Sequence, residues 1–240
     1  MSIRLKETTR FSVLVLHEED ASGEGGEARR YFEKMCHCIP YERAREASRQ
    51  EREQLPQQSG SLTYGEVEYE SLSVIFDRIR EFGGLEGEDL EFVDLGSGCG
   101  RPLIAAALLY PSLARLVGVE ILRGLYEMSL EVKREWDERA QSYGDERASS
   151  ITFIHGSILE LDTYDWTKAD IILANSTCFT IPFFGQIEKL AENCRAGTIF
   201  ISLTHCLGYG DGATTSWELL DSMRLKMSWG HAEVSISRRR

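Results

Sequence analysis

The ten residues from 92 to 101, Phe-Val-Asp-Leu-Gly-Ser-Gly-Cys-Gly-Arg, constrain the fold of this chain more than any other stretch. A short apolar run ends in an acid, Asp94, and the chain then turns through Gly96, Gly98 and Gly100 into an apolar helical run. This order predicts a strand, a tight glycine turn and the start of a helix. Glycine is needed where the backbone bends sharply and approaches a ligand with no side chain in the way. We therefore expect a ligand to lie on this turn.

The glycine spacing separates two nucleotide-type ligands. A dinucleotide site has the pattern Gly-x-Gly-x-x-Gly, with a helix N-terminus aimed at a pyrophosphate. This loop instead reads Gly-x-Gly-x-Gly, and a carboxylate, Asp94, stands two residues before the first glycine. A carboxylate repels a pyrophosphate but attracts the ammonium group of an amino-acid moiety. S-adenosylmethionine carries that ammonium group.

A second acid supports the same cofactor. The stretch 115–120 reads as another strand and ends at Glu120, which is placed to accept hydrogen bonds from both ribose hydroxyls. With Asp94, the turn residues Ser97 and Gly100, and Glu120 together, we predict a site for S-adenosylmethionine. The alternative is an ordinary glycine cap at a helix end, without a ligand.

Composition limits the class of protein. A chain of 240 residues with 42% hydrophobic content is long enough for one substantial core. The formal net charge of -12 argues against a surface devoted to nucleic acid, because phosphate binding needs clustered Lys and Arg. The segment Arg238 to Arg240 is the concentrated basic spot, and a short exposed charge run is usually solvated. Basic partners are the simpler expectation.

The sequence shows neither a secretory leader nor an apolar run long enough to span a bilayer, so we expect an intracellular protein without membrane contact. Its six cysteines lack paired metal-ligand spacing. The run Cys36-His37-Cys38 has no second cluster to complete a tetrahedral site, so no metal is predicted.

Two regions are expected along the chain. Residues 1–60 form an N-terminal extension that is partly helical, with an exposed helix expected over the charged stretch 41–54, and residues 61–240 form the catalytic domain. The domain alternates strands and helices and closes in a hairpin. Helices are predicted at 67–79, 102–110, 122–140 and 182–194, and strands at 91–93, 115–120, 151–155, 169–174, 198–203, 225–229 and 232–237. The series predicts an α/β fold of the class I methyltransferase, Rossmann-like type, with a mainly parallel sheet and a reversed C-terminal edge hairpin.

In open sheets of this kind the ligand lies at the carboxyl ends of the strands. This rule adds Ser157 and the segment from Asn175 to Phe179 to the candidate site. Asn175 follows a predicted strand with no turn glycine after it, which favours a contact with substrate or cofactor. For Phe179, core packing is an equally good interpretation.

The chain resembles the disruptor-of-telomeric-silencing family of histone lysine methyltransferases, which lack a SET domain. The resemblance runs from about residue 62 to 236 and rests on Thr-Tyr-Gly-Glu-Val at 63–67, on the glycine turn with Glu120, and on Asn-Ser-Thr-Cys-Phe at 175–179. It implies a loop over the methionine end of the cofactor, formed by Tyr64, Gly65, Glu66 and Val67. It also implies cofactor contacts from Arg101, Ser157 and Ile158, and an acceptor channel lined by Tyr64, Asn175 and Phe179.

The departures from the family leave the substrate open. Ser157 stands where the family usually has an acid, Arg101 where it tends to have glutamine, and small polar residues replace aromatic ones after Asn175. We therefore expect a protein substrate, with a nucleosomal histone as the candidate and a nuclear location implied by the resemblance. The alternatives are a methyltransferase acting on a non-histone protein or a small molecule, and a cofactor-binding scaffold without catalysis.

Overall fold

The computed structural model describes residues 26–54, 62–110, 112–142, 150–208 and 216–240. Its helices are α1 (Glu27–Cys36), α2 (Tyr41–Arg52), α3 (Tyr69–Glu81), α4 (Arg101–Leu109), α5 (Arg123–Ser142) and α6 (Ile181–Ala191), with short 3-10 turns η2 (Trp166–Lys168) and η3 (Ser176–Cys178). Its strands are β1 (Leu90–Leu95), β2 (Leu113–Glu120), β3 (Ser150–His155), β4 (Ile171–Ala174), β5 (Ile199–Leu203), β6 (Trp217–Met227) and β7 (Gly230–Arg239).

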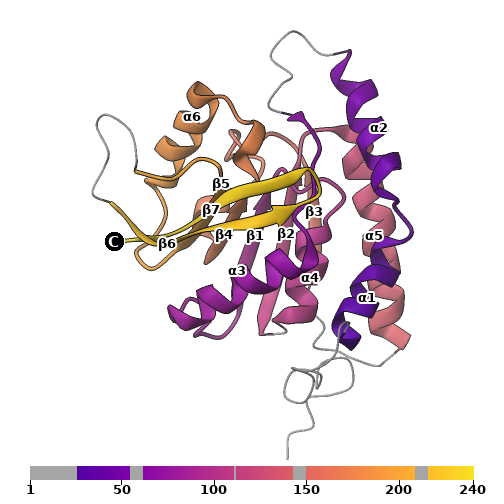
Figure 1. The fold of residues 1–240 in the computed structure, drawn as a ribbon, viewed down its shortest axis with the longest axis horizontal. Helices are drawn as coiled ribbons and strands as arrows, with labels where there is room; N and C mark the ends of the chain where they lie inside the picture. Colours follow the sequence, from indigo (N-terminus) through magenta and orange to yellow (C-terminus); the bar gives the residue numbers. More distant parts are fainter. Residues whose placement is uncertain (1–25, 55–61, 111, 143–149, 209–215) are drawn as a thin grey trace, which may run out of the picture.

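The described strands form one seven-stranded sheet in the order β3-β2-β1-β4-β5-β7-β6 (Figure 1). Strands β1 to β5 pair in parallel, and β7 pairs antiparallel with both β5 and β6. The α/β prediction with a mainly parallel sheet and a reversed C-terminal hairpin is confirmed. The reversed strand β7 lies one place inside the edge, and β6 is the edge strand.

Two hydrophobic cores cover the two faces of the sheet. Along β1, Phe92 belongs to the core formed with α1, α3, α4 and α5, and Val93 belongs to the core formed with α6 and Trp166. This alternation follows from the two-residue period of a strand. Helix α6 therefore lies on the opposite face from α3, α4 and α5 (Figure 1). The central strands β1, β2, β4 and β5 are buried on both faces and are therefore mainly apolar, as parallel strands usually are.

The final hairpin differs in detail from the prediction. The turn was expected at Gly230-His231, but Met227 pairs with Gly230, so Ser228 and Trp229 form the turn. The first strand is also longer than expected, because β6 extends back to Trp217. Its edge position leaves much of β6 exposed, and a half-exposed strand carries little of the apolar signal that predicts a strand.

The N-terminal helices pack onto the domain. The predicted helix at 41–54 is α2, which lies alongside α5 (Figure 1), whereas α1 was not predicted. Met35 and Ile39 are buried in the same core as α4 and α5. Glu51 of α2 accepts hydrogen bonds from the N–H groups that begin α5, at 2.8 and 2.9 Å. The predicted boundary at residue 60 lies outside the described residues and stays a prediction.

Candidate functional site

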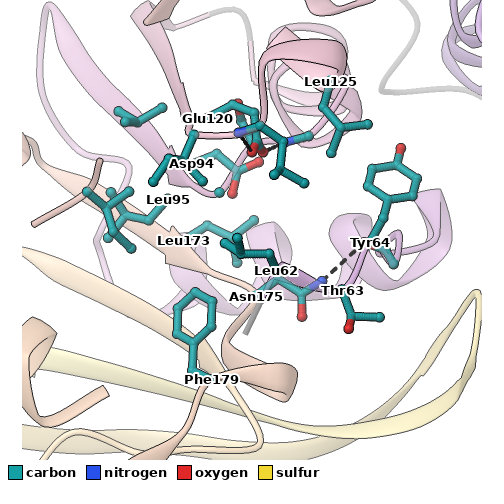
Figure 2. Close-up of a pocket in the computed structure, with 18 of the residues that line it drawn as sticks. Leu62, Thr63, Tyr64, Asp94, Leu95, Glu120, Leu125, Leu173, Asn175 and Phe179 are labelled. Carbon is teal, nitrogen blue, oxygen red and sulfur yellow. Dashed lines mark hydrogen bonds between the residues drawn. The ribbon is translucent and has the colours of Figure 1, made fainter. Parts of the chain in front are cut away.

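A cavity of about 810 Å³ opens at the carboxyl ends of β1, β2 and β4, where an open α/β sheet places its ligand (Figure 2). Its volume lies in the range of sites for small molecules and cofactors. The sequence-predicted residues that line it are Tyr64, Gly65, Glu66, Val67, Asp94, Gly96, Ser97, Gly98, Arg101, Glu120, Ser157, Ile158, Asn175 and Phe179. Gly100 is not part of the lining, and it caps α4 instead.

The glycine turn forms the floor of the cavity. Gly96, Gly98 and Gly100 have φ angles of 82°, 55° and 84°, values that residues with a Cβ atom rarely adopt. The N–H groups of Gly96 and Ser97 donate to the Val119 carbonyl at 2.8 and 3.0 Å, which ties the turn to β2. A Cβ atom at Gly96 would meet no protein atom within 4 Å, so the space in front of it is free for a ligand.

The two predicted acids lie side by side at the ends of β1 and β2 (Figure 2). Glu120 accepts from the Gly98 N–H at 2.8 Å and from the Leu122 N–H at 2.7 Å, and each carboxylate oxygen keeps a further lone pair. Burial raises the pKa of Glu120, against these hydrogen bonds, which lower it. Burial, with a smaller contribution from Glu120, raises the pKa of Asp94 to about 8. Within the described part of the chain no hydrogen-bond donor or cation is assigned to Asp94, so the site favours a positively charged group.

A loop at 62–67 covers one side of the cavity and is held by a charged network. The Tyr64 hydroxyl donates to Glu66 at 2.5 Å, and Arg101 Nε lies 3.0 Å from the same Glu66 oxygen, an ion pair without hydrogen-bond geometry. Arg101 Nη2 also donates to the Ile39 carbonyl at 3.0 Å. Burial raises the pKa of Glu66 in spite of Arg101 and Tyr64, which lower it. One guanidinium group thus joins the loop, α4 and the turn between α1 and α2.

The tip of the final hairpin holds the same loop from outside. The Glu66 N–H donates to Ser228 Oγ at 3.0 Å, and the Ser228 N–H donates to the Glu66 carbonyl at 3.0 Å. The Trp229 ring lies so close to Gly65 that a Cβ atom there would overlap it. On the inner side, the Tyr64 ring would lie 2.6 Å from a Cβ atom at Gly98. The loop is therefore enclosed between the hairpin and the glycine turn.

Asn175 and Phe179 lie on the opposite wall. Asn175 Nδ2 donates to the Gly65 carbonyl at 3.2 Å, which connects the wall to the covering loop (Figure 2). Its Oδ1 atom is buried, and among the described residues it has no hydrogen-bond partner. The Phe179 ring meets Phe183 edge to face, with ring centroids 4.9 Å apart. Asn175 Oδ1 is therefore a free acceptor beside two aromatic rings, and it could accept a hydrogen bond from an N–H group of a ligand.

Ser157 and Ile158 lie at the end of the cavity near Glu120. Ser157 Oγ accepts from the Leu159 N–H at 3.2 Å, and Ile158 is nearly buried. Ile121, which directly follows the second acid, was missed by the sequence analysis. It lines the cavity and is 45% exposed, so its apolar side chain is available to pack against a bound ligand. Its place after Glu120 is a signal that could have identified it.

The other lining residues that were not predicted are mostly apolar residues of the covering loop, α5 and α6: Leu62, Thr63, Leu95, Pro102, Val119, Leu122, Leu125, Leu173, Thr180, Pro182, Phe183 and Gln186. They come from helix faces and strand ends whose orientation depends on tertiary packing. No local pattern in the sequence singles them out.

The C-terminal arginines Arg238 and Arg239 contact the ends of helices. Arg238 and Arg239 donate to the carbonyls of Phe82, Glu192 and Cys194 near the ends of α3 and α6. Cation contacts of this kind stabilise helix C-termini. All six cysteines are free thiols. Within the described residues, no cluster of metal-ligating side chains occurs, and no helix is both long and apolar enough to cross a membrane.

Comparison with known proteins identifies the family of the chain. The family model described as "Histone methylation protein DOT1" matches residues 47–229. A curated relative from Kluyveromyces lactis, "Histone-lysine N-methyltransferase, H3 lysine-79 specific", is 26% identical over 145 residues, which cover 60% of this chain and 24% of that protein. The "Arsenite methyltransferase" of Homo sapiens is 27% identical over 148 residues, covering 60% of this chain and 36% of that protein.

Among solved structures, a putative O-methyltransferase from Klebsiella pneumoniae superimposes with a TM-score of 0.52 at 15% identity, covering 88% of this chain and 95% of that one. At this identity the likeness shows the fold alone. The chain spans about a quarter to a third of the length of the curated relatives named above.

Proposed function

The chain belongs to the DOT1 family of histone methylation proteins, and from that premise we propose that it is an S-adenosylmethionine-dependent methyltransferase whose acceptor is a lysine of a histone. The observation that carries the proposal is that one cavity holds two buried acceptors: the Asp94 carboxylate, and Asn175 Oδ1, which has no hydrogen-bond partner among the described residues. The first suits the ammonium group of the cofactor, and the second suits the N–H of an amine acceptor.

The residues present fit the cofactor. Asp94 would accept from its ammonium group, and Glu120 retains the lone pairs needed for two ribose hydroxyls. Arg101 is the cationic side chain among the described residues that line the cavity, so it would meet the α-carboxylate. The open space at Gly96 and the apolar side chains of Ile121 and Ile158 would accommodate the remaining parts of the molecule.

When bound, the cofactor supplies an electrophilic methyl group on a positively charged sulfur. The protein contributes alignment and a dry channel, because transfer to nitrogen is an in-line displacement. Asn175 Oδ1 would accept one N–H of the incoming amine and so orient its lone pair toward the methyl group. Phe179 and Phe183 would exclude water. A lysine amine has a pKa of about 10.4 in water, and its desolvation there lowers this pKa, which favours the neutral nucleophile.

The covering loop would act by position. The Tyr64 hydroxyl is taken up by Glu66, so its ring lies on the glycine turn at the methionine end and does not reach toward Phe179 (Figure 2). We propose that Tyr64, Gly65, Glu66 and Val67 close this end against water. The channel for the acceptor would then run between this loop and the wall formed by Asn175 and Phe179.

A second candidate, a methyltransferase for a small molecule, is favoured by one specific observation. A curated relative of similar identity is named an arsenite methyltransferase, and the residues after Asn175 are the small Ser176, Thr177 and Cys178. Cys178 is an exposed thiol.

The test is methyl transfer from radiolabelled S-adenosylmethionine to nucleosomes, free core histones, arsenite with a thiol reductant, and a hypomethylated cell extract. The proposal predicts label on a core histone lysine in the nucleosome sample, located by mass spectrometry. Asn175→Ala should lower kcat about 10- to 100-fold and leave the Kd of S-adenosylhomocysteine within about threefold. Label on arsenite would support the second candidate, and cofactor binding without any labelled acceptor would support a scaffold.

A nuclear location is part of the same proposal, because a nucleosomal acceptor is found there. Fluorescence microscopy of the tagged full chain tests it. Exclusion of the chain from the nucleus would remove the support for a nucleosomal substrate and favour an acceptor elsewhere.

A further inference from the structure

The chain makes an unusual turn directly after β5. Thr204 has a φ angle of 69°, a value that only one other described non-glycine residue, Asp89, approaches. The N–H of His205 donates to the carbonyl of Leu203 at 2.8 Å. A hydrogen bond between residues two apart, around a central residue of positive φ, defines the rare and strained form of γ-turn. Such a conformation persists only where the surrounding structure holds it in place.

Contacts with neighbouring elements hold the turn. The Thr204 N–H donates to the Glu233 carbonyl of β7 at 2.8 Å. Its hydroxyl donates to the Thr177 hydroxyl at 3.2 Å. The Leu203 carbonyl accepts a second hydrogen bond, from Ser176 Oγ at 2.5 Å. Two of these contacts reach the segment that follows Asn175, so the strained turn is attached to one wall of the cavity.

His205 attaches the other end of the same segment. Its Nε2 atom lies 2.9 Å from the carbonyl oxygen of Phe179. A carbonyl only accepts, so Nε2 carries the proton in this contact. The imidazole ring stacks on Phe184 of α6, with centroids 4.8 Å apart and an interplanar angle of 24°. The ring is thus fixed on one side by α6 while its N–H fixes Phe179.

We propose that the γ-turn from Leu203 to His205 is the positioning element of the acceptor wall, and that His205 is a positioning residue for methyl transfer. The description of this wall as the acceptor side rests on the proposed function. Ser176 follows Asn175 directly, and the Phe179 carbonyl belongs to the residue whose ring lines the cavity. Because both are hydrogen-bonded to one turn, the turn sets the spacing between the amide that receives the amine and the ring that excludes water.

The physical consequence falls on turnover. Transfer to nitrogen requires near-linear approach, and a misplacement of about 1 Å can lower the rate about 100-fold. In the described part of the chain, His205 contacts Leu203, Phe179 and Phe184 and makes no hydrogen bond or ring contact with the cofactor wall, which is formed by the glycine turn and the ends of β1 and β2. Loss of the His205 hydrogen bond should therefore lower kcat for the acceptor without a matching loss of cofactor affinity.

The experiment compares three full-length variants with the wild-type protein. His205→Phe keeps an aromatic ring against Phe184 but removes the donor, and His205→Gln returns an N–H near the position of Nε2. His231→Phe is the matched control, since His231 is exposed on β7. We expect His205→Phe to lower kcat about 10- to 100-fold, with the acceptor KM and the Kd of S-adenosylhomocysteine within about twofold. His205→Gln should regain most of the rate, and His231→Phe should match the wild type.

Amide hydrogen exchange supplies a readout that needs no substrate. In His205→Phe the peptide covering 176–184 should exchange faster than in the wild type and in His205→Gln, while the peptide covering 94–101 should be unchanged. If the wild type methylates no acceptor, the proposed function fails, but faster exchange in 176–184 alone still supports the positioning role. Unchanged exchange, wild-type kcat, or an equal loss of cofactor affinity in His205→Phe would each overturn the inference.

Discussion

Binding of the cofactor should release a proton from Asp94. This carboxyl group is buried at the end of β1 beside Glu120, and burial together with that second carboxylate raises its pKa to about 8. At pH 7 roughly nine in ten molecules of the free protein would then carry a proton on Asp94. An ammonium group can be paired only by the ionised form. The proton must therefore leave when the amino-acid end of the cofactor enters.

The magnitude follows from the pKa. Because the pKa of Asp94 is raised, its carboxyl group in the free protein holds a proton up to about pH 8. Below that pH, each further unit lowers the ionised fraction about tenfold, which weakens ligand binding by about 1.4 kcal/mol. The affinity must rise with pH in this window. The Kd of S-adenosylhomocysteine should fall about tenfold from pH 6 to pH 7. It should level off above about pH 8, where Asp94 is ionised in the free protein as well.

Isothermal titration calorimetry at pH 6.5, in two buffers of different ionisation enthalpy, measures this proton directly. We expect release of about 0.9 proton per ligand bound in the wild-type protein. Asp94→Asn should weaken binding and abolish both the release and the pH dependence. Asp89→Asn, which removes an exposed carboxylate, should leave both unchanged. A wild-type Kd that is equal at pH 6 and pH 7, without proton release, would refute the assignment of Asp94 to the ammonium group.

Further substitutions test the framework of the site. Glu51→Ala removes the two hydrogen bonds that cap α5 and should lower the free energy of unfolding by about 1–2 kcal/mol in urea titrations, whereas an unchanged midpoint would contradict the cap. Gly118→Ala places a Cβ atom 2.5 Å from the Ser97 hydroxyl of the glycine turn and should lower the free energy of unfolding by about 1–3 kcal/mol. Gly185→Ala lies in α6, where the new Cβ atom meets no atom within 4 Å, and should raise the free energy of unfolding by about 0.5–1 kcal/mol. Gly65→Ala should weaken cofactor binding because its Cβ atom overlaps the Trp229 ring, and adding Trp229→Ala should restore part of that affinity. If the losses of affinity in the two single variants simply add in the double variant, the two residues are not coupled.

The cofactor half of the site was predictable because its signals are local. Asp94 and the glycines lie within seven residues, and each has a physical reason that can be recognised without the fold. Glu120 follows from the end of the next apolar strand. The strand-end rule then placed Ser157 and Asn175 at the same edge of the sheet, and all four of these polar residues line one cavity.

The contacts that hold the other half were not predictable, because they join residues distant in sequence. The hairpin residue Ser228 makes two hydrogen bonds with Glu66, 162 positions earlier, one through its N–H and one through its hydroxyl. Arg101 reaches the Ile39 carbonyl, and its sequence position gave no indication of that partner. The γ-turn at Thr204 has no sequence signal at all, since a β-branched residue is among the least expected at a positive φ angle.

This division between local and distant contacts has a functional meaning. The cofactor wall is built mainly from one continuous stretch, β1 through the end of β2, so substitutions there should change cofactor affinity. The acceptor wall is assembled from the Asn175 segment and the turn at Thr204, which lie far apart in the sequence. Substitutions in these elements should change kcat. The hydrogen bond from Asn175 Nδ2 to the Gly65 carbonyl joins the covering loop to the acceptor wall. Across this bond, a change at Gly65 is expected to alter cofactor affinity, whereas a change at Asn175 is expected to alter turnover.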